Sequence, residues 1–423
     1  MKSNYEWKSV MNLLRIKHLR KGQIKPIQSL KDGIDTLVIA PTSFGKSAIY
    51  QIPALCHSNQ LTIVVEPTLS LMHNQVQILK EHKLSADYID HLMKSKDINS
   101  ILNKVRKGKL TFLYVTPERL QNRYFQEIIK QSDLYMLVVD ECHCVTEWGY
   151  TFRDAYLQIG NFLDNLSNRP VVLACSATIL DDKQKEIINL LHLRNPKSFR
   201  MDLKRDNLIL IKKNMTSEKK SLENRLQERF KMMVKYIKKY KKDSSVIVYA
   251  LTTGYVDSIY SYLSEIYPNE VARYHSQIKS EKIKRQMEMD FLTGKKKIIV
   301  ATTAFGMGID VSDISLALHF NMPINMTDYI QQIGRAGRDG RKAHCVLFYD
   351  YNDDDKKITA SLIKKFTQKL KVEISMRKNY QQISEFIDST NCMMRDVLFY
   401  QGQEEEKSCK RCTNCAKKRR GNQ

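Results

Sequence analysis

The sequence predicts an α/β protein with two parallel-sheet lobes in tandem and a small helical module after them. Two sets of short, β-rich apolar runs alternate with helical patterns, which is typical of parallel sheets covered on both faces. The length of 423 residues exceeds what one compact core holds and predicts two or three domains. Four of the nine cysteines lie in the last 32 residues, which sets the end of the chain apart.

The predicted strands fall into two groups, each bounded by turn residues or followed by a helical stretch. The first group includes Thr36–Ala40, Thr62–Val65, Leu110–Val115, Met136–Val139 and Val171–Cys175. The second group includes Ser245–Tyr249, Lys297–Ala301, Leu316–Phe320 and Ala343–Tyr349. Each group therefore predicts one α/β lobe.

The joint between the lobes is predicted near Arg194–Ser217. The amphipathic stretch Leu222–Tyr240 follows, and we expect its apolar face to pack against the second lobe. After the acidic turn Asp350–Asp355, helical sequence continues to Tyr400 and the cysteines follow. The expected domains are a first lobe at 1–200, a second lobe at 201–350 and a helical module with a basic tail at 351–423.

The composition points to a polyanionic partner. The chain carries 69 Lys and Arg against 46 Asp and Glu, a formal net charge of +23. The alternative is a composition effect, because lysine-rich chains are also typical of AT-rich genomes. Apolar runs such as Leu134–Val139 are far shorter than the roughly 18 residues of a membrane span. The N-terminus lacks the apolar stretch of a secretory signal, so we expect a reducing compartment.

A phosphate-binding loop is predicted at Ala40–Ser47, between a strand and a helix, with Ala40 in place of the usual first glycine. Backbone N–H groups at the start of the helix would cradle phosphate oxygens. Lys46 would place its charge at the β- and γ-phosphates, and the Ser47 hydroxyl would ligate Mg²⁺. The predicted nucleotide contacts of the loop are Thr42, Ser43, Gly45, Lys46 and Ser47.

Two acids follow the apolar run Leu137–Val139, in the sequence Asp140-Glu141-Cys142-His143. The carboxyl edge of an open α/β sheet is where ligands bind. Asp140 would hold Mg²⁺, and Glu141 would act as the base for an attacking water. The alternative is that the two acids only begin a helix.

Cys392, Cys409, Cys412 and Cys415 have the spacing of a closed zinc site with four thiolate ligands. A redox-active Cys-x-x-Cys pair is the alternative, although no thioredoxin-like pattern surrounds it.

Five short motifs, taken together, resemble those of superfamily 2 helicases. The phosphate loop, the Asp-Glu-Cys-His run and Ser176–Thr178 resemble motifs I, II and III, while Ala301–Asp310 and Gln331–Arg338 resemble motifs V and VI. Within that superfamily the RecQ family is the closest resemblance, on Leu19–Gln23, Ser47–Ala54, Leu113–Leu120, Cys144–Tyr156 and the four cysteines. The resemblance spans about residues 10–415 and implies two RecA-like lobes.

The resemblance also implies roles for individual residues. Arg20 and Gln23 would contact ATP, with Gln23 reading adenine, and Asp310 would belong to the nucleotide site. Gln331 would help to place the attacking water. Arg335 and Arg338, from the second lobe, would meet the γ-phosphate as arginine fingers on ATP bound between the lobes.

An aromatic-rich segment follows the two acids. The resemblance assigns Trp148, Phe152, Arg153 and Tyr156 to nucleic-acid binding. Flat aromatic faces stack on unpaired bases, and an arginine pairs with phosphate or stacks on a base. The alternative is that the aromatic side chains pack in the lobe interior.

The sequence departs from the RecQ pattern at several positions. Ile16 replaces an adenine-stacking aromatic residue, Phe44 replaces a glycine of the loop, and Cys142 replaces the usual alanine. Met393 and Met394 replace paired arginines. We expect no winged-helix domain after the zinc module. A basic tail, Lys417–Arg420, either contacts phosphates or is a solvated end.

The resemblance implies an ATP-dependent 3′-to-5′ DNA helicase that uses ATP, Mg²⁺ and Zn²⁺. Its partners would be single-stranded and tailed duplex DNA, with protein partners in DNA repair or recombination and no membrane. We expect a monomeric motor in the cytoplasm, at the nucleoid of a prokaryote, or in the nucleus of a eukaryote. The alternatives are an RNA helicase, a duplex translocase with the same motor, and a non-motor zinc protein that binds nucleic acid.

Overall fold

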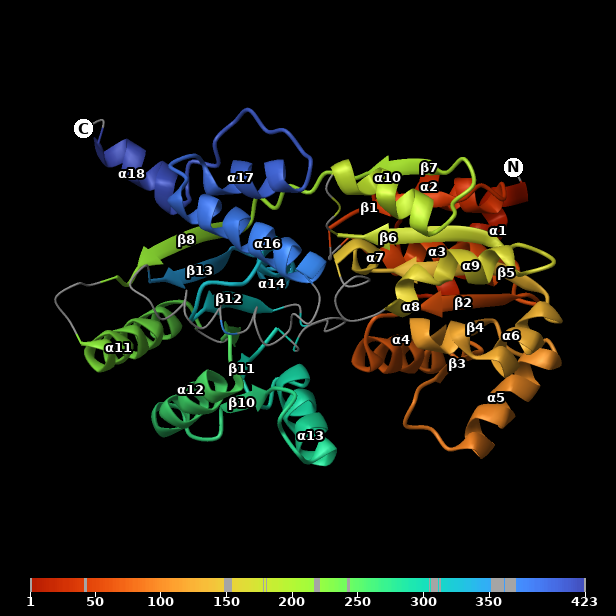
Figure 1. Cartoon of the computed structure of the whole chain (residues 1–423), viewed down its shortest axis with the longest axis horizontal. Helices are drawn as coiled ribbons and strands as arrows, with labels where there is room; N and C mark the ends of the chain where they lie inside the picture. The colour runs from red at the N-terminus through yellow and green to blue at the C-terminus, as the bar shows by residue number, and fades with distance from the viewer. Residues whose placement is uncertain are drawn as a thin grey trace. The chain divides into compact units, whose positions relative to one another are not determined.

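The computed structural model describes most of the chain (Figure 1). The described residues are 2–41, 44–147, 154–177, 179, 181–216, 221–241, 244–303, 305, 311, 313–350, 361 and 370–421. The chain divides into two compact units, Met1–Asp202 and Leu203–Gln423. The division falls within the predicted joint, Arg194–Ser217. Among the described helices, none combines the length and the apolar character that crossing a membrane requires.

The first unit is built on a seven-stranded sheet with the order β3-β4-β2-β5-β6-β1-β7. All of its strand pairs are parallel. The strands are β1 Thr36–Ile39, β2 Leu61–Val65, β3 Ala86–Ile89, β4 Phe112–Val115, β5 Leu134–Asp140, β6 Val171–Ser176 and β7 Lys197–Arg200.

Helices connect these strands and cover the sheet (Figure 1). They are α1 Lys2–Leu13, α2 Ile24–Lys31, α3 Lys46–Cys56, α4 Leu69–Glu81, α5 Ser95–Arg106, α6 Arg123–Lys130, α7 Cys144–Glu147, α8 Asp154–Leu157, α9 Ile159–Asp164 and α10 Asp181–Leu190, with a 3₁₀ turn at Pro117–Gln121. One core cluster joins Val64, Val138 and Leu173 of the strands to Ile49 of α3 and Met72 of α4. The central strands are buried throughout, as a sheet covered on both faces requires.

The second unit is built on a six-stranded parallel sheet with the order β10-β11-β9-β12-β13-β8. Its strands are β8 Leu208–Asn214, β9 Ser245–Tyr249, β10 Val271–Tyr274, β11 Ile298–Ala301, β12 Ile314–His319 and β13 Ala343–Tyr349. Its helices are α11 Leu222–Tyr240, α12 Thr253–Ile266, α13 Glu281–Leu292, α14 Met326–Ile333, α16 Leu370–Asp388, α17 Met393–Tyr400 and α18 Thr413–Gly421.

The predicted amphipathic helix is confirmed as α11, with the bounds expected from its apolar pattern. Met233, Val234 and Ile237 from its apolar face belong to the core of the second unit, together with Val248 and Leu318 of the sheet. This helix therefore packs its own unit, which was the expected role.

Every strand that the sequence predicted is present, and four more strands were not predicted: β3, β7, β8 and β10. These four are the edge strands of the two sheets. An edge strand has a neighbour on one side only and tolerates polar residues, so its sequence is not a continuous apolar run. The sequence Lys-Ser-Phe-Arg of β7 is an example, since two of its four side chains are exposed.

Candidate nucleotide site and metal centre

The phosphate loop ends at α3, whose N-cap is Gly45. Its φ of 80° is left-handed, a conformation that favours glycine, and a Cβ there would lie 3.1 Å from Nε2 of Gln23. Gly45 offers no side chain to cap the helix, whereas Thr68 and Asn122 cap α4 and α6 with their side-chain oxygens. The first turn of α3 thus lacks a side-chain cap from Gly45, which suits the binding of an anion such as phosphate.

Gln23 holds this loop in place. Its side-chain Nε2 donates to the backbone carbonyls of Phe44 and Gly45, each at 3.0 Å, and its Oε1 accepts from the backbone N–H of Arg20 at 2.7 Å. The residue is almost fully buried. In this structure both N–H groups of the amide are committed to the loop backbone, and the amide oxygen keeps a second lone pair with which it could accept a bond from adenine. The side chain of Arg20 is exposed.

Lys46 is the first residue of α3 and points to the end of β5. Its Nζ lies 3.0 Å from Oε1 of Glu141 and 3.8 Å from Oδ1 of Asp140. Glu141 adopts a φ of 49°, an uncommon conformation for a residue other than glycine. The structure thus brings together Lys46, Asp140 and Glu141, three of the predicted catalytic residues, at the carboxyl edge of the first sheet. Ser47 is half-buried beside Lys46.

The charged side chains of Lys46, Asp140 and Glu141 shift one another's pKa values. Burial disfavours the charged form of Lys46, but attraction to Glu141 and Asp140 outweighs it and raises the pKa of Lys46. Burial alone would raise the pKa of Glu141, but Lys46 and His143 hold that pKa well below its usual range. Burial raises the pKa of Asp140 against the opposing pull of Lys46. Glu141 is therefore the ionised carboxylate of the pair, held in that form by Lys46.

Two further contacts connect the acids to β6. Cys175 Sγ donates to Oδ1 of Asp140 at 3.2 Å, and Nδ1 of His143 lies 2.8 Å from Oγ of Ser176. The His143 ring is also 3.4 Å from Oε2 of Glu141. β5 and β6 are parallel neighbours, so residues that follow them meet at the same edge. The sequence motifs named Ser176 and His143, but only the sheet order places them in contact.

Glu66 is a third acid at this edge, and the sequence analysis did not name it. It follows β2, which neighbours β5 with Val65 opposite Val139. The side chain is fully buried, and neither carboxylate oxygen has a hydrogen-bond partner within the described residues. Burial, and then repulsion from Asp140 and Glu141, raises the pKa of Glu66 well above the usual range. An acid directly after an apolar strand was the signal that could have found it.

In the second unit, Gln331 lies on α14 and Arg335 and Arg338 follow it. Gln331 and Arg335 are largely buried. Both arginines lie near Tyr249 at the end of β9, where burial raises the pKa of the tyrosine and the two arginines oppose that rise. His319, at the end of β12, meets Gln332 of the same helix at 2.7 Å. The structure therefore gathers these predicted residues at one edge of the second sheet.

Several predicted site residues lie outside the described part of the chain: Thr42, Ser43, Trp148, Phe152, Arg153 and Asp310. Tyr156 is described, and its expected stacking role needs correction. The side chain on α8 is fully buried. A buried ring has no free face for a base, so Tyr156 is a core residue in this structure.

The four predicted zinc ligands converge. The Sγ atoms of Cys392, Cys409, Cys412 and Cys415 all lie within 4.8 Å of one another. A tetrahedral Zn²⁺ with Zn–S bonds of about 2.3 Å needs sulfur atoms about 3.8 Å apart, so the cluster fits this metal with little adjustment. Backbone N–H groups of Cys409 and Cys412 donate to the sulfurs of Cys392 and Cys409, at 3.1 and 3.4 Å. Such bonds favour thiolates.

Known proteins resemble this chain in both units. Residues 20–187 match the family model described as DEAD/DEAH box helicase, and residues 228–340 match the helicase conserved C-terminal domain. The ATP-dependent DNA helicase RecQ of Bacillus subtilis is 33% identical over 94% of this chain and 64% of its own length. The chain belongs to the ATP-dependent helicases that share these two domains, and it is similar to the RecQ proteins among them. It spans about three fifths of the length of the bacterial RecQ proteins that it matches.

Two other matches show the breadth of the family and of the fold. A putative ATP-dependent RNA helicase, R290, of Acanthamoeba polyphaga mimivirus is 30% identical over 97% of this chain and 72% of its own length. The structure of Dbp5 from S. cerevisiae bound to RNA and ADP BeF3 matches with a TM-score of 0.65 at 16% identity, over 89% of this chain and 97% of that one. At that identity the structural match shows the fold alone.

Proposed function

We propose that this chain is an ATP-dependent DNA helicase of RecQ type that couples ATP hydrolysis to 3′-to-5′ movement on single-stranded DNA. The observation that carries the proposal is the buried group of Lys46, Asp140 and Glu141 beside the N-terminus of α3. A charged lysine at a helix N-terminus suits a triphosphate, and an ionised carboxylate whose pKa rises when that lysine turns to the phosphates suits a water that must lose a proton.

In this proposal, each site residue of the first unit has its own role in ATP hydrolysis. Lys46 leaves Glu141 for the β- and γ-phosphates, which frees the Glu141 carboxylate to accept the proton of the attacking water. Ser47 and Asp140 offer the oxygen ligands that Mg²⁺ prefers, and bound Mg²⁺ would neutralise phosphate charge. His143, which meets both Glu141 and Ser176, orients the base. Thr42 and Ser43 complete the loop, and Arg20 and Gln23 contact the nucleotide.

The second unit is proposed to supply the remaining charge. Arg335 and Arg338 stabilise the negative charge that develops on the γ-phosphate, and Gln331 helps to place the water. Asp310 completes the nucleotide contacts. The support is that Gln331, Arg335 and Arg338 gather at the end of β9 and α14 in a family whose members are named as ATP-dependent helicases.

Trp148, Phe152 and Arg153 are proposed to contact the strand. Their segment follows Glu141 by a few residues, so strand binding there can report directly to the base. The four cysteines are proposed to hold a structural Zn²⁺, which would stabilise the fold around α17 and α18. We expect a monomeric motor with protein partners in repair or recombination, in the compartment that holds DNA.

ATP hydrolysis with matched polynucleotides tests the proposal. We expect phosphate release to be slow without nucleic acid and to rise at least about tenfold with single-stranded DNA, because strand binding must organise the base for turnover. RNA of the same length and sequence serves as the control. No turnover under any condition would overturn the motor, and equal stimulation by RNA would overturn the choice of DNA.

An RNA helicase is the second candidate. It is favoured by the 30% identity to the mimivirus protein, which is named a putative RNA helicase. The phosphate backbone alone does not separate the two, since DNA and RNA carry the same charge. Stimulation by RNA and not by DNA would be the outcome expected for this candidate.

A further inference from the structure

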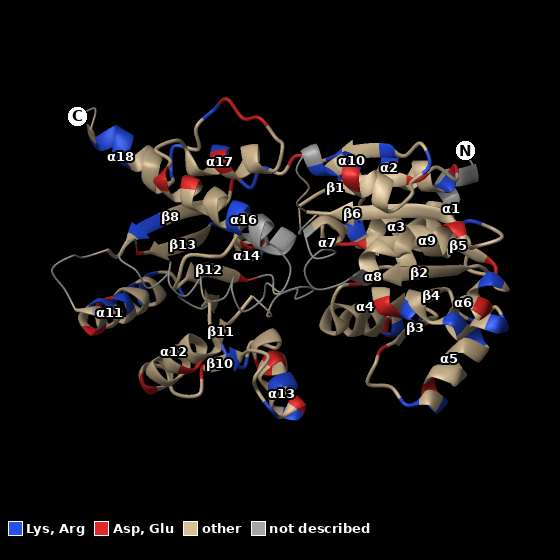
Figure 2. Ribbon diagram, viewed as in Figure 1, with Lys and Arg blue, Asp and Glu red and all other residues tan. Residues whose placement is uncertain are grey.

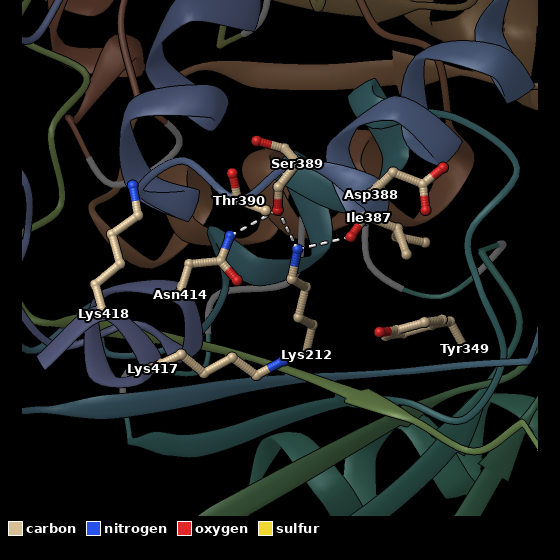
Figure 3. A pocket seen from close by; sticks show the side chains of 9 residues that line it. All are labelled: Lys212, Tyr349, Ile387, Asp388, Ser389, Thr390, Asn414, Lys417 and Lys418. Carbon is tan, nitrogen blue, oxygen red and sulfur yellow. Dashed lines mark hydrogen bonds between the residues drawn. The ribbon is translucent and has the colours of Figure 1, made fainter. Parts of the chain in front are cut away.

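A polar pocket in the second unit has none of Gln331, Arg335 and Arg338 in its lining. It is formed where β8, the end of α16 and the helix α18 meet, and its cavity volume is about 460 Å³ (Figure 3). The residues that line it are Lys212, Tyr349, Ile387, Asp388, Ser389, Thr390, Asn414, Lys417 and Lys418. Three of the nine are lysines and one is an acid, which points to an anionic ligand.

Lys212 is the buried cation of the pocket. It lies on β8 with 8% of its surface exposed, and its Nζ donates to the carbonyls of Ile387 and Ser389, each at 2.6 Å. These carbonyls end α16, where a cation is favourable. An ammonium group has three N–H donors, and these bonds use two of them. Within the described residues, the third N–H has no acceptor and is available to a ligand.

The other two lysines are held on a fixed support. The backbone N–H of Lys212 donates to Oγ1 of Thr413 at 3.1 Å, which ties the start of α18 to β8. Asn414 donates to the carbonyls of Ser389 and Asn391, at 2.8 and 2.6 Å. Figure 3 shows Lys212 and Asn414 both reaching Ser389, while Lys417 and Lys418 extend from α18. Their exposed side chains therefore stand at the rim of a rigid pocket.

The positive charge of the pocket is not fully balanced. Burial, and then repulsion from Lys417, lowers the pKa of Lys212, and the attraction of Asp396 and Asp388 does not cancel this. Figure 2 shows Lys and Arg, in blue, at the end of β8 and over the last part of α18. A lysine whose charged form is disfavoured gains from an anion nearby, because the anion restores the lost stabilisation.

We propose that this pocket binds one phosphate group of a nucleic-acid backbone, an inference that rests on the proposed function. Lys212 would contact the phosphate oxygens from the floor of the pocket, and Lys417 and Lys418 from the rim. The cavity exceeds what one phosphate fills, and Tyr349 and Ile387 offer apolar surface to the adjoining sugar. Because the rim is exposed, a nucleic-acid strand could enter and leave the pocket on either side of the bound phosphate. A free phosphate ion would not require such an opening.

Lysine footprinting of the full chain tests the site directly. The chain is reductively methylated alone, with a single-stranded DNA 20-mer, and with inorganic phosphate at the same phosphate concentration, and each lysine is quantified by mass spectrometry. We expect the oligonucleotide to lower methylation of Lys417 and Lys418 at least about threefold, since phosphate contact covers the amines. Lys295, whose side chain is 73% exposed away from the pocket, serves as the reference and is expected to be unchanged.

A matched pair of double variants separates the pocket from the general charge of α18. Lys417→Gln with Lys418→Gln removes two charges that line the pocket, and Arg419→Gln with Arg420→Gln removes two from the same exposed helix outside the lining. We expect the lysine pair to raise the Kd for the oligonucleotide roughly fivefold and the arginine pair less than about twofold. Zinc content and the thermal midpoint of each variant report whether the fold is kept.

Each outcome decides between the sources of the phosphate. Equal losses in the two double variants, or no protection of Lys417 and Lys418 in a chain that binds the oligonucleotide, overturn the pocket and leave the proposed function standing. Protection by inorganic phosphate as strong as that by DNA overturns the backbone assignment. A wild-type chain that neither binds the oligonucleotide nor hydrolyses ATP removes the proposed function, and this inference with it.

Discussion

At the scale of single residues, Lys46 and Glu141 form a buried ion pair. A substitution that removes the charge of one of them therefore leaves the charge of the other without its partner. Lys46 lies within ion-pair distance of both acids, and it and the acids are largely buried. This ion pair joins the start of α3 to the end of β5, although the two residues are 95 positions apart in sequence.

We predict that Lys46→Ala abolishes ATP turnover, because the loop loses its phosphate-binding charge and the two buried acids lose their ion-pair partner. Glu141→Gln is predicted to bind nucleotide still and to hydrolyse it roughly 10²–10⁴ times more slowly, because only the base is lost. Steady-state phosphate release and binding of a fluorescent nucleotide analogue separate the two. Near-normal turnover by Glu141→Gln would contradict the assignment of the base.

Glu66 and Tyr156 show the limits of motif reasoning at this scale. Glu66 belongs to none of the motifs named from the sequence, yet it lies at the same sheet edge as Asp140. Tyr156 belongs to the aromatic-rich segment, yet its ring is in the core. Burial depends on which elements pack over a residue, and the neighbours in sequence do not report it.

At the scale of elements, the cysteine cluster depends on the connection between α17 and α18. Cys392 is the N-cap of α17, and Cys415 lies within α18, while the other two cysteines lie in the loop between them. A metal held by all four would tie both helix starts to that loop. Metal binding would then contribute directly to the folding free energy of this part of the chain.

We predict about one Zn²⁺ per purified chain, since four thiolates complete one closed site. Cys412→Ser is predicted to lose the metal and to lower the thermal midpoint. Cys56→Ser, which removes a half-buried thiol of the first unit outside the cluster, serves as the control and keeps the metal. Elemental analysis checks the metal content, and folded, freshly reduced protein without zinc would refute the site.

The edge strands of the two sheets were harder to predict from sequence than the buried strands. The buried strands were predicted from their apolar runs because both faces of each must avoid water. β3, β7, β8 and β10 each pair on one side only and were missed. One of them, β8, carries Lys212 of the proposed phosphate pocket, so the missed strand is also the one with a proposed binding role.

At the scale of the whole molecule, the formal net charge of +23 favours binding to the negatively charged backbone of a nucleic acid. Phosphate contacts release counterions from the strand, so affinity that rests on lysine and arginine falls steeply as salt rises. Contacts to phosphate groups do not discriminate between base sequences. We therefore expect DNA binding by this chain to show little preference for base sequence.

We predict that the chain unwinds a duplex with a 3′ single-stranded tail, and that blunt and 5′-tailed duplexes are unwound at least about tenfold more slowly, because the motor must load on a strand before it moves. Raising the salt from 50 to 200 mM is predicted to weaken DNA binding on the order of 10²-fold. A strand-displacement assay at the two salt levels checks both. Equal rates on blunt and 3′-tailed duplexes would indicate a duplex translocase.

The sequence alone determined the features that depend on local order. Apolar runs identified the central strands, the amphipathic pattern identified α11 with its bounds, and ordered motifs identified Lys46, Asp140, Glu141 and the four cysteines. These features can be predicted from sequence because buried strands, amphipathic helices and metal-ligand spacings each produce a pattern within a short segment of the chain.

Only the tertiary structure decided which of these residues meet. The order of the parallel strands brings Glu66, Asp140 and Ser176 to one edge, although they are far apart in sequence. The packing of α18 on β8 brings Lys417 to Lys212, which no spacing predicts. Such contacts arise from long-range pairing, and the free energy that selects one pairing is spread over the whole core rather than over any one segment.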